Sequence, residues 1–185
     1  VPRATADNWK LDACPHLGPA TAAVLAAEQT HLVWFTNGSE RKGIHYGRFD
    51  HATQTTAPIA AIDTEADARH ADIASIGERV NVAWKKQGAD SARSMLRVST
   101  NDGNSWSPPL EVATDTAASD YPFLLTQGEQ VFLAWKMEGR LRVERISNNV
   151  ASEPELKEFS RDSVAALENA SRDSPLSVSI SAPKP

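Results

Sequence analysis

The chain has 185 residues, a hydrophobic content of 41% and a formal net charge of −5 at pH 7. This composition supports a folded core, and the negative charge argues against a surface that binds nucleic-acid phosphates. No apolar stretch is long enough to span a bilayer as a helix. Residue 1 is Val rather than Met, so we expect the chain to be processed or cut from something longer.

The side-chain pattern repeats about every fifty residues. Trp34, Trp84 and Trp135 follow one another at intervals of 50 and 51 residues. Around each Trp the order is the same: a short apolar run, a polar turn, a run ending in Trp, a charged loop and an alternating run. A fixed period of this size is typical of β-propellers and solenoids, in which one unit cannot bury its own apolar face.

Runs with period-two alternation predict β-strands, and turn residues separate these runs. The first unit is predicted to hold strands at 22–28, 30–36, 43–50 and 57–63, the second at 72–76, 79–85, 95–100 and 110–114, and the third at 122–126, 130–136 and 141–146. The third unit is one strand short. Residues 1–5 precede the first unit as a fourth strand would, so we predict a strand there that closes the incomplete unit.

The repeat predicts an all-β fold, a β-propeller built of four-stranded blades over residues 1–150, with about three blades in this chain. Propellers use about four to eight blades, so further blades would come from a longer native chain or from a second copy. A homodimer would then hold about six blades. Residues 151–185 are predicted to be a C-terminal tail with a helix at 161–172.

Segment 99–106, Ser-Thr-Asn-Asp-Gly-Asn-Ser-Trp, lies between the third and fourth strands of the second unit. We expect the hydroxyl of Ser99 and the side chain of Asn101 to bond backbone groups, Gly103 to take a positive φ, and Trp106 to fill the blade. The segment resembles the Asp-box, or bacterial neuraminidase (BNR) repeat, of sialidase-like propellers, with Asn101 in the place of the Asp. In that family the motif is a structural element of the turn and is seldom catalytic.

The resemblance to sialidase-like repeat proteins covers about residues 1–150, and it implies a periplasmic or secreted bacterial protein. Enzymes of that family use an arginine cluster, a Tyr-Glu nucleophile pair and an Asp acid/base. This chain lacks the family's Phe/Tyr-Arg-Ile-Pro segment, and neither Tyr46 nor Tyr121 has an evident Glu partner. Since a fold does not imply hydrolysis, we expect a non-enzymatic binding protein. The alternative is a sialidase-like glycoside hydrolase whose active site is completed by other blades.

Family geometry places the connections from strand four to strand one on the axial face, together with the loops between strands two and three. The residues predicted to bind a ligand on this face are Arg69, His70, Asp120, Tyr121 and Lys136. The cations among them could bind a carboxylate or another anion, so the expected partner is a glycan, an anion or a metal. The alternative is that these charged loop side chains are simply solvated.

Cys14 is the only cysteine, so no disulfide can form within the chain. A thiolate and an imidazole two residues apart, Cys14 and His16, suit a soft metal such as copper, and Met137 could add a thioether. A copper- or other soft-metal-binding protein is therefore a further alternative function. The structural alternative is a small apolar Cys in the blade junction and a His bonded to a loop carbonyl.

Overall fold

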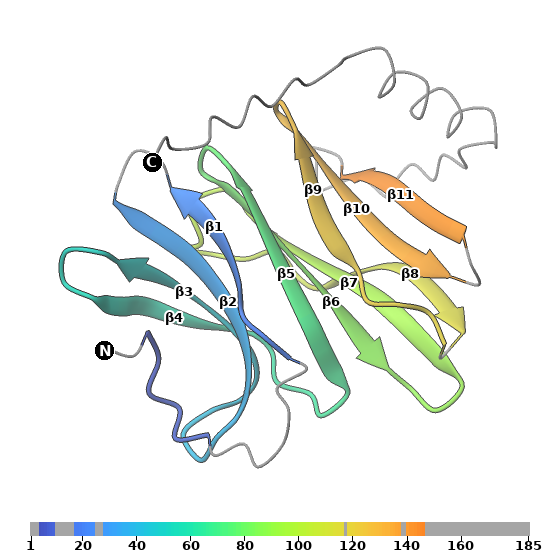
Figure 1. Ribbon diagram of the computed structural model, residues 1–185, viewed down its shortest axis with the longest axis horizontal. Helices are drawn as coiled ribbons and strands as arrows, with labels where there is room; N and C mark the ends of the chain where they lie inside the picture. Colours follow the sequence, from blue (N-terminus) through green and yellow to red (C-terminus); the bar gives the residue numbers. More distant parts are fainter. Residues whose placement is uncertain (1–3, 10–16, 25–27, 117, 138–139, 147–185) are drawn as a thin grey trace, which may run out of the picture. The chain divides into compact units, whose positions relative to one another are not determined.

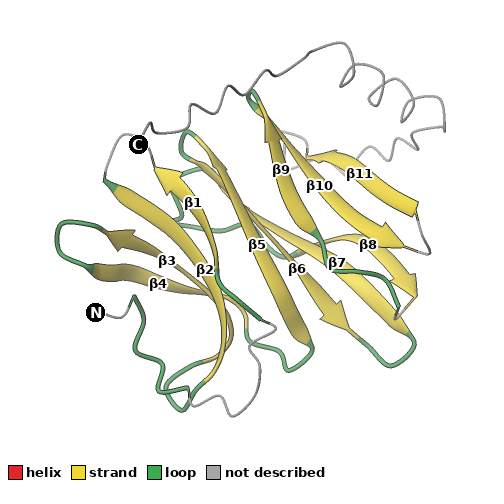
Figure 2. Cartoon of the chain, in the orientation of Figure 1, coloured by secondary structure: helices red, strands yellow, loops and turns green. Residues whose placement is uncertain are grey.

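The computed structural model describes residues 4–9, 17–24, 28–116, 118–137 and 140–146, and all regular structure in them is β-strand (Figures 1 and 2). The strands are β1 (Ala20–Val24), β2 (Gln29–Asn37), β3 (Lys42–Asp50), β4 (Thr55–Asp63), β5 (Ala68–Ile76), β6 (Arg79–Gln87), β7 (Ser91–Ser99), β8 (Leu110–Thr116), β9 (Phe123–Gln127), β10 (Gln130–Met137) and β11 (Arg140–Ile146). Every strand predicted inside the three repeats is present. The described residues contain no helix that is long and apolar enough to cross a membrane.

The strands form three antiparallel sheets in which neighbours in sequence are neighbours in space. Blade 1 is β1-β2-β3-β4, blade 2 is β5-β6-β7-β8, and blade 3 is β9-β10-β11. The innermost strands β1, β5 and β9 lie next to one another, and each blade packs a face on the next (Figure 1). The prediction of an all-β fold of propeller blades is thus confirmed.

Alternation along β6, the second strand of blade 2, sends side chains to both neighbouring blades. In β6, Val80, Val82 and Trp84 belong to the core shared with blade 1, whereas Ala83 belongs to the core shared with blade 3. The strand is therefore buried on both faces, as expected for a sheet covered on both sides. The place of each Trp at the end of an inner strand predicts that it is buried against the next blade, but Trp84 and Trp135 face the preceding one. They are fully buried, as predicted.

Two predictions concern the ends of the chain. Residues 4 and 5 are not in a strand, so the prediction of a strand at 1–5 is wrong for its described part. The segment instead lies against blade 1, where the Thr56 hydroxyl donates to the carbonyl oxygen of Ala4 at 2.5 Å. The predicted tail at 151–185 and its helix lie outside the described residues.

Candidate functional site

Neighbouring blades are joined by one repeated hydrogen bond, which we call the Trp–Asp latch. Trp84 Nε1 donates to Asp63 at 2.8 Å, and Trp135 Nε1 donates to Asp115 at 2.6 Å. Each Asp lies near the end of the fourth strand of the preceding blade. A buried indole N–H needs an acceptor, and a carboxylate is a strong one. The latch therefore fixes each blade against the end of the blade before it.

The N-terminal segment makes the same contact without belonging to a strand. Trp34 Nε1 donates to Asp7 Oδ2 at 2.7 Å, and Arg41 Nη1 donates to Asp7 Oδ1 at 2.8 Å. A Cβ added at Gly38 would lie 1.8 Å from the carbonyl oxygen of Asp7, so Gly38 is what permits this close approach. Asp7 therefore stands where the fourth strand of a preceding blade would place its Asp.

The connection from β4 to β5 surrounds a buried lysine with acidic side chains. Lys86 Nζ lies 2.5 Å from Glu65, 3.5 Å from Asp67 and 3.7 Å from Asp63. Burial acts most strongly on Lys86 and would lower its pKa, but the three carboxylates together outweigh burial and raise it. Lys86 therefore stays charged and is paired with carboxylates of this chain. Arg41 is likewise paired with Asp7, so neither cation is available to bind a ligand.

Two of the predicted ligand-binding residues meet where inner strands β5 and β9 begin. The rings of His70 and Tyr121 are stacked, with centroids 4.6 Å apart and planes at 14°. His70 has φ of +48° beside an irregularity in the β5–β6 pairing, which turns its side chain out of the regular alternation. Tyr121 is 49% exposed. An exposed tyrosine ring backed by a second ring is a flat platform on which an apolar surface can stack.

Arg69, another predicted ligand-binding residue, makes its contacts within the chain. Arg69 donates to the carbonyl oxygens of Ala66 and Ala68, and its guanidinium lies over Phe35, 5.3 Å from the ring centroid. Arg69 is therefore held in place by the connection.

Asp120 and Lys136 adjoin the aromatic pair. The Asp120 amide donates to the carbonyl oxygen of Lys136 at 2.8 Å, which brings the exposed Lys136 next to Tyr121. Lys85, at the equivalent place in blade 2, is buried and donates to the carbonyl oxygen of Ser119 at 2.6 Å. Burial, partly opposed by Asp120, lowers the pKa of Lys85. Lys136 is exposed, because no described blade follows blade 3.

At the opposite end of the blades, the 99–106 loop is held by its own polar side chains. Ser99 Oγ accepts from the Gly103 amide at 2.9 Å, and Asn101 Oδ1 accepts from the Ser105 amide at 2.9 Å. Gly103 has φ of +79°. These are the contacts expected from the motif. Trp106 packs edge-on against Tyr46 of blade 1, with ring centroids 4.8 Å apart, so it joins two blades rather than filling its own.

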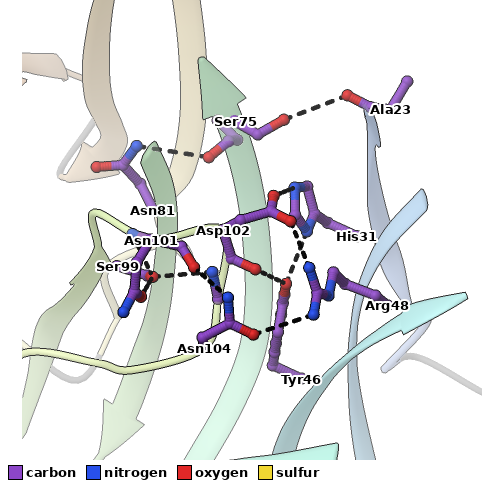
Figure 3. Close-up of polar contacts among 12 residues, drawn as sticks. Ala23, His31, Tyr46, Arg48, Ser75, Asn81, Ser99, Asn101, Asp102 and Asn104 are labelled. Carbon is purple, nitrogen blue, oxygen red and sulfur yellow. Dashed lines mark hydrogen bonds and ion pairs between the residues drawn. The ribbon is translucent and has the colours of Figure 1, made fainter. Parts of the chain in front are cut away.

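Two residues of the same loop contact polar side chains of blade 1, as Figure 3 shows. His31 Nδ1 lies 2.7 Å from the Tyr46 hydroxyl, and His31 Nε2 lies 3.3 Å from the Asp102 carboxylate. Arg48 donates to Asp102 and to Asn104. His31 and Tyr46 are both 0% exposed. We call these five residues the interblade cluster.

Burial shifts the pKa values of two residues in the interblade cluster. Burial, as the largest effect, lowers the pKa of His31, with Asp102 opposing and Arg48 adding to the shift. Burial also raises the pKa of the Tyr46 hydroxyl well above its usual range. Tyr46 contacts a histidine and a backbone carbonyl rather than the Glu that a nucleophilic tyrosine would need. The described contacts of the Tyr46 hydroxyl therefore do not include the Glu of the sialidase pair.

The predicted soft-metal site cannot be placed. Cys14 and His16 lie outside the described residues, and the side chain of Met137 does as well. Within the part of the chain that the structure describes, no group of three or more His, Cys, Asp or Glu side chains could hold a metal ion.

The sequence pattern did not lead us to predict the Trp–Asp latch or the interblade cluster. A signal for the latch was present, because an Asp precedes each Trp by 27, 21 and 20 residues in turn. The interblade cluster had no comparable signal, since its members come from β2, β3 and a loop more than fifty residues away.

No family model matches the chain, and no curated protein sequence matches it. Among solved structures, the chain is similar to the GH32 beta-fructofuranosidase BmSUC1 of Bombyx mori, with 12% identity and a TM-score of 0.38 over 68% of this chain. It is also similar to a mutant of that enzyme in complex with sucrose, with 12% identity and a TM-score of 0.37 over 64% of this chain. The chain spans only 32% and 31% of those two chains. A likeness of this size carries no argument about activity or residues.

Proposed function

We propose that this chain is a ligand-binding propeller unit whose site lies where the connections enter the inner strands. The observation that carries the proposal is the stacked pair of His70 and Tyr121, with half of the Tyr121 surface exposed. The backbone of Lys136 bonds to Asp120 next to the pair, and the Lys136 side chain is exposed. A flat aromatic surface beside a cation suits a small ligand with one apolar face and one anionic group, such as a sugar acid.

Assignment to the sialidase-like repeat family is part of this proposal. Its support is the 99–106 loop, in which Ser99 and Asn101 bond the backbone as the Asp-box resemblance implies. A periplasmic or secreted location would follow from the same family. We favour a non-enzymatic role, because the described surroundings of Tyr46 and Tyr121 include no contacting Glu.

The binding proposal is tested with N-acetylneuraminate and glucuronate as probes and neutral N-acetylglucosamine as the comparison, by titration calorimetry. We expect binding of an acidic sugar by wild type, a loss of about tenfold for Lys136→Gln, and a larger loss for Tyr121→Ala. Tyr121→Phe keeps the ring and should bind as wild type does. Equal binding by wild type and Tyr121→Ala would contradict the proposed site, and so would a complete lack of binding of both acidic probes.

A soft-metal site at Cys14 and His16, with copper as the expected metal, stays a prediction. Thiolate and imidazole ligands should favour Cu(I) over Mg(II), and binding should weaken below a His pKa of about 6.5. Competition against a Cu(I) chelator, with Cys14→Ala beside wild type, is the measurement. Equal metal content in the two proteins would assign Cys14 to packing.

A further inference from the structure

Blade 3 has an apolar face that no described strand covers. The β9–β10–β11 register sets Phe123, Leu125, Phe132, Leu141 and Val143 on one side of the sheet, because residues paired across strands share a face. The exposed cations Lys136 and Arg145 lie on the same side, paired with Leu141 and Phe132. The other side carries Leu124, Leu133 and Trp135, which pack on blade 2. Leu125 is 46% exposed and Leu141 is 58% exposed. We call this side the outer face of blade 3.

The equivalent faces of the other blades are interfaces. Val33 and Tyr46 of blade 1 pack against blade 2, and Ala83 and Leu96 of blade 2 pack against blade 3. Each pair lies directly across two central strands, just as Ala134 and Val143 do in blade 3. The outer face of blade 3 thus continues the same series of interfaces, and the expected occupant is another blade.

Blade 1 shows the complementary surface. Ile73 of β5 and Leu124 of β9 are buried against the preceding blade, but Thr21, at the equivalent place in β1, is exposed, and so is Ala23. Part of the face that should receive a preceding blade is therefore open.

Residues 4–9 complete this complementary surface. Asp7 makes the latch to Trp34 that fourth strands make elsewhere, but its segment pairs with no sheet. Blade 3 has the opposite defect, since its last described strand β11 has a ladder on one side only. Residues 4–9 thus resemble a fourth strand whose blade is not among the described strands, and blade 3 has no fourth strand among the described residues. An unpaired edge readily accepts a strand from another chain.

We infer that blade 3 docks on blade 1 of a second copy of this chain, with β11 pairing to residues 4–9 of that copy. The arrangement is head-to-tail, and two copies related by a twofold axis make the contact twice and close a ring. Closure covers the outer face of blade 3 and removes the open edge of β11. The occupant is a second copy because this chain itself carries both complementary surfaces.

The test uses sedimentation equilibrium and light scattering on three single variants. Wild type should have twice the 20.0 kDa chain mass at micromolar concentration. Leu125→Arg places a charge on the outer face, and Thr21→Arg places one on the open face of blade 1. Each should weaken dimerisation by about 30-fold or more, the loss expected when a central contact is removed. Thr116→Arg adds the same charge to the exposed outer strand of blade 2 and should leave the dimer intact.

Mixing the variants distinguishes the head-to-tail ring from other dimers. In a homodimer of either Leu125→Arg or Thr21→Arg, the charge lies in both contacts between the two copies. In a mixture, the unchanged blade 3 of Thr21→Arg can dock on the unchanged blade 1 of Leu125→Arg. One wild-type contact then remains, so a heterodimer should form. Hydrogen exchange should also slow in residues 140–146 and 4–9 as the concentration rises. A wild-type monomer would overturn the inference. A dimer that Thr21→Arg leaves intact would overturn it as well, because blade 3 would then pack on something other than blade 1.

Discussion

The two described interfaces between blades share a latch but differ in what surrounds it. The interface of blades 1 and 2 holds the interblade cluster, in which His31 and Tyr46 are buried beside a loop carboxylate. At the interface of blades 2 and 3, the positions equivalent to His31 and Tyr46 are Asn81, which donates to the Ala74 carbonyl oxygen of its own blade, and Leu96, which belongs to the apolar cluster there. The blades therefore share one geometry, whereas the side chains at each interface differ in chemistry.

The difference has a physical consequence. An apolar interface tolerates small adjustments, whereas a buried polar cluster loses stability when any one partner is lost. The interface of blades 1 and 2 should therefore respond more strongly to substitution and to pH. Four predictions test this difference, from the largest expected effect to the smallest.

The strongest is Gly103→Ala. A Cβ at Gly103 would lie 2.0 Å from the Tyr46 hydroxyl, and φ is +79°. Strain from the positive φ and overpacking against a buried ring should together cost about 3 kcal/mol. Gly128→Ala is the matched control, because its φ is +56° but nothing lies within 4 Å of its Cβ position, and it should cost about 1 kcal/mol. Urea unfolding gives the free energy of unfolding of both variants. Equal losses would show that a Cβ at Gly103 does not clash with Tyr46.

The second prediction compares the two latches. Asp63→Ala removes the acceptor of the Trp84 indole and one of the carboxylates around buried Lys86, so it should cost about 2 kcal/mol. Asp115→Ala removes the acceptor of Trp135 and should cost about 1 kcal/mol. Urea unfolding of both variants is the measurement. A larger cost for Asp115→Ala would mean that Lys86 does not depend on Asp63.

The third prediction concerns pH. Burial lowers the pKa of His31 in the folded protein, so its contribution to stability is complete above the unfolded value of about 6.5 and is lost as pH falls below it. His31→Asn installs the residue that blade 2 has at this position. The variant should lose about 1 kcal/mol at neutral pH, since the Tyr46 hydroxyl loses the His31 imidazole and keeps only the Asp102 carbonyl oxygen.

The free energy of unfolding of His31→Asn should then fall less steeply than that of wild type between pH 7 and pH 5. His45 is also buried with a lowered pKa, so some slope will persist in the variant. Parallel pH profiles for the two proteins would show that His31 does not titrate differently in the folded state.

The smallest effect is expected for Asn101→Asp, which introduces the Asp of the motif that this loop resembles. Asn101 Oδ1 already accepts from the Ser105 amide and from the Ser99 hydroxyl, and a carboxylate oxygen would accept both. The amide contact to the Ser105 hydroxyl is replaced by one in which that hydroxyl donates. We expect a change within about 0.5 kcal/mol by thermal unfolding. A loss above about 2 kcal/mol would mean that the loop needs the Asn amide as a donor.

The sequence alone determined the strands and the blade order of this protein. Period-two alternation, turn residues and the spacing of Trp34, Trp84 and Trp135 are local signals, and all strands predicted within the repeats are present. The contacts of Ser99 and Asn101 were also predictable, because they join residues within one turn.

Only the tertiary structure decided which faces meet. The stacking of His70 on Tyr121 and the contact of His31 with Asp102 join residues of different blades. Asp7 was invisible as a latch because it lies outside any strand pattern. Contacts between blades depend on register and twist accumulated over whole sheets, which side-chain periodicity does not encode.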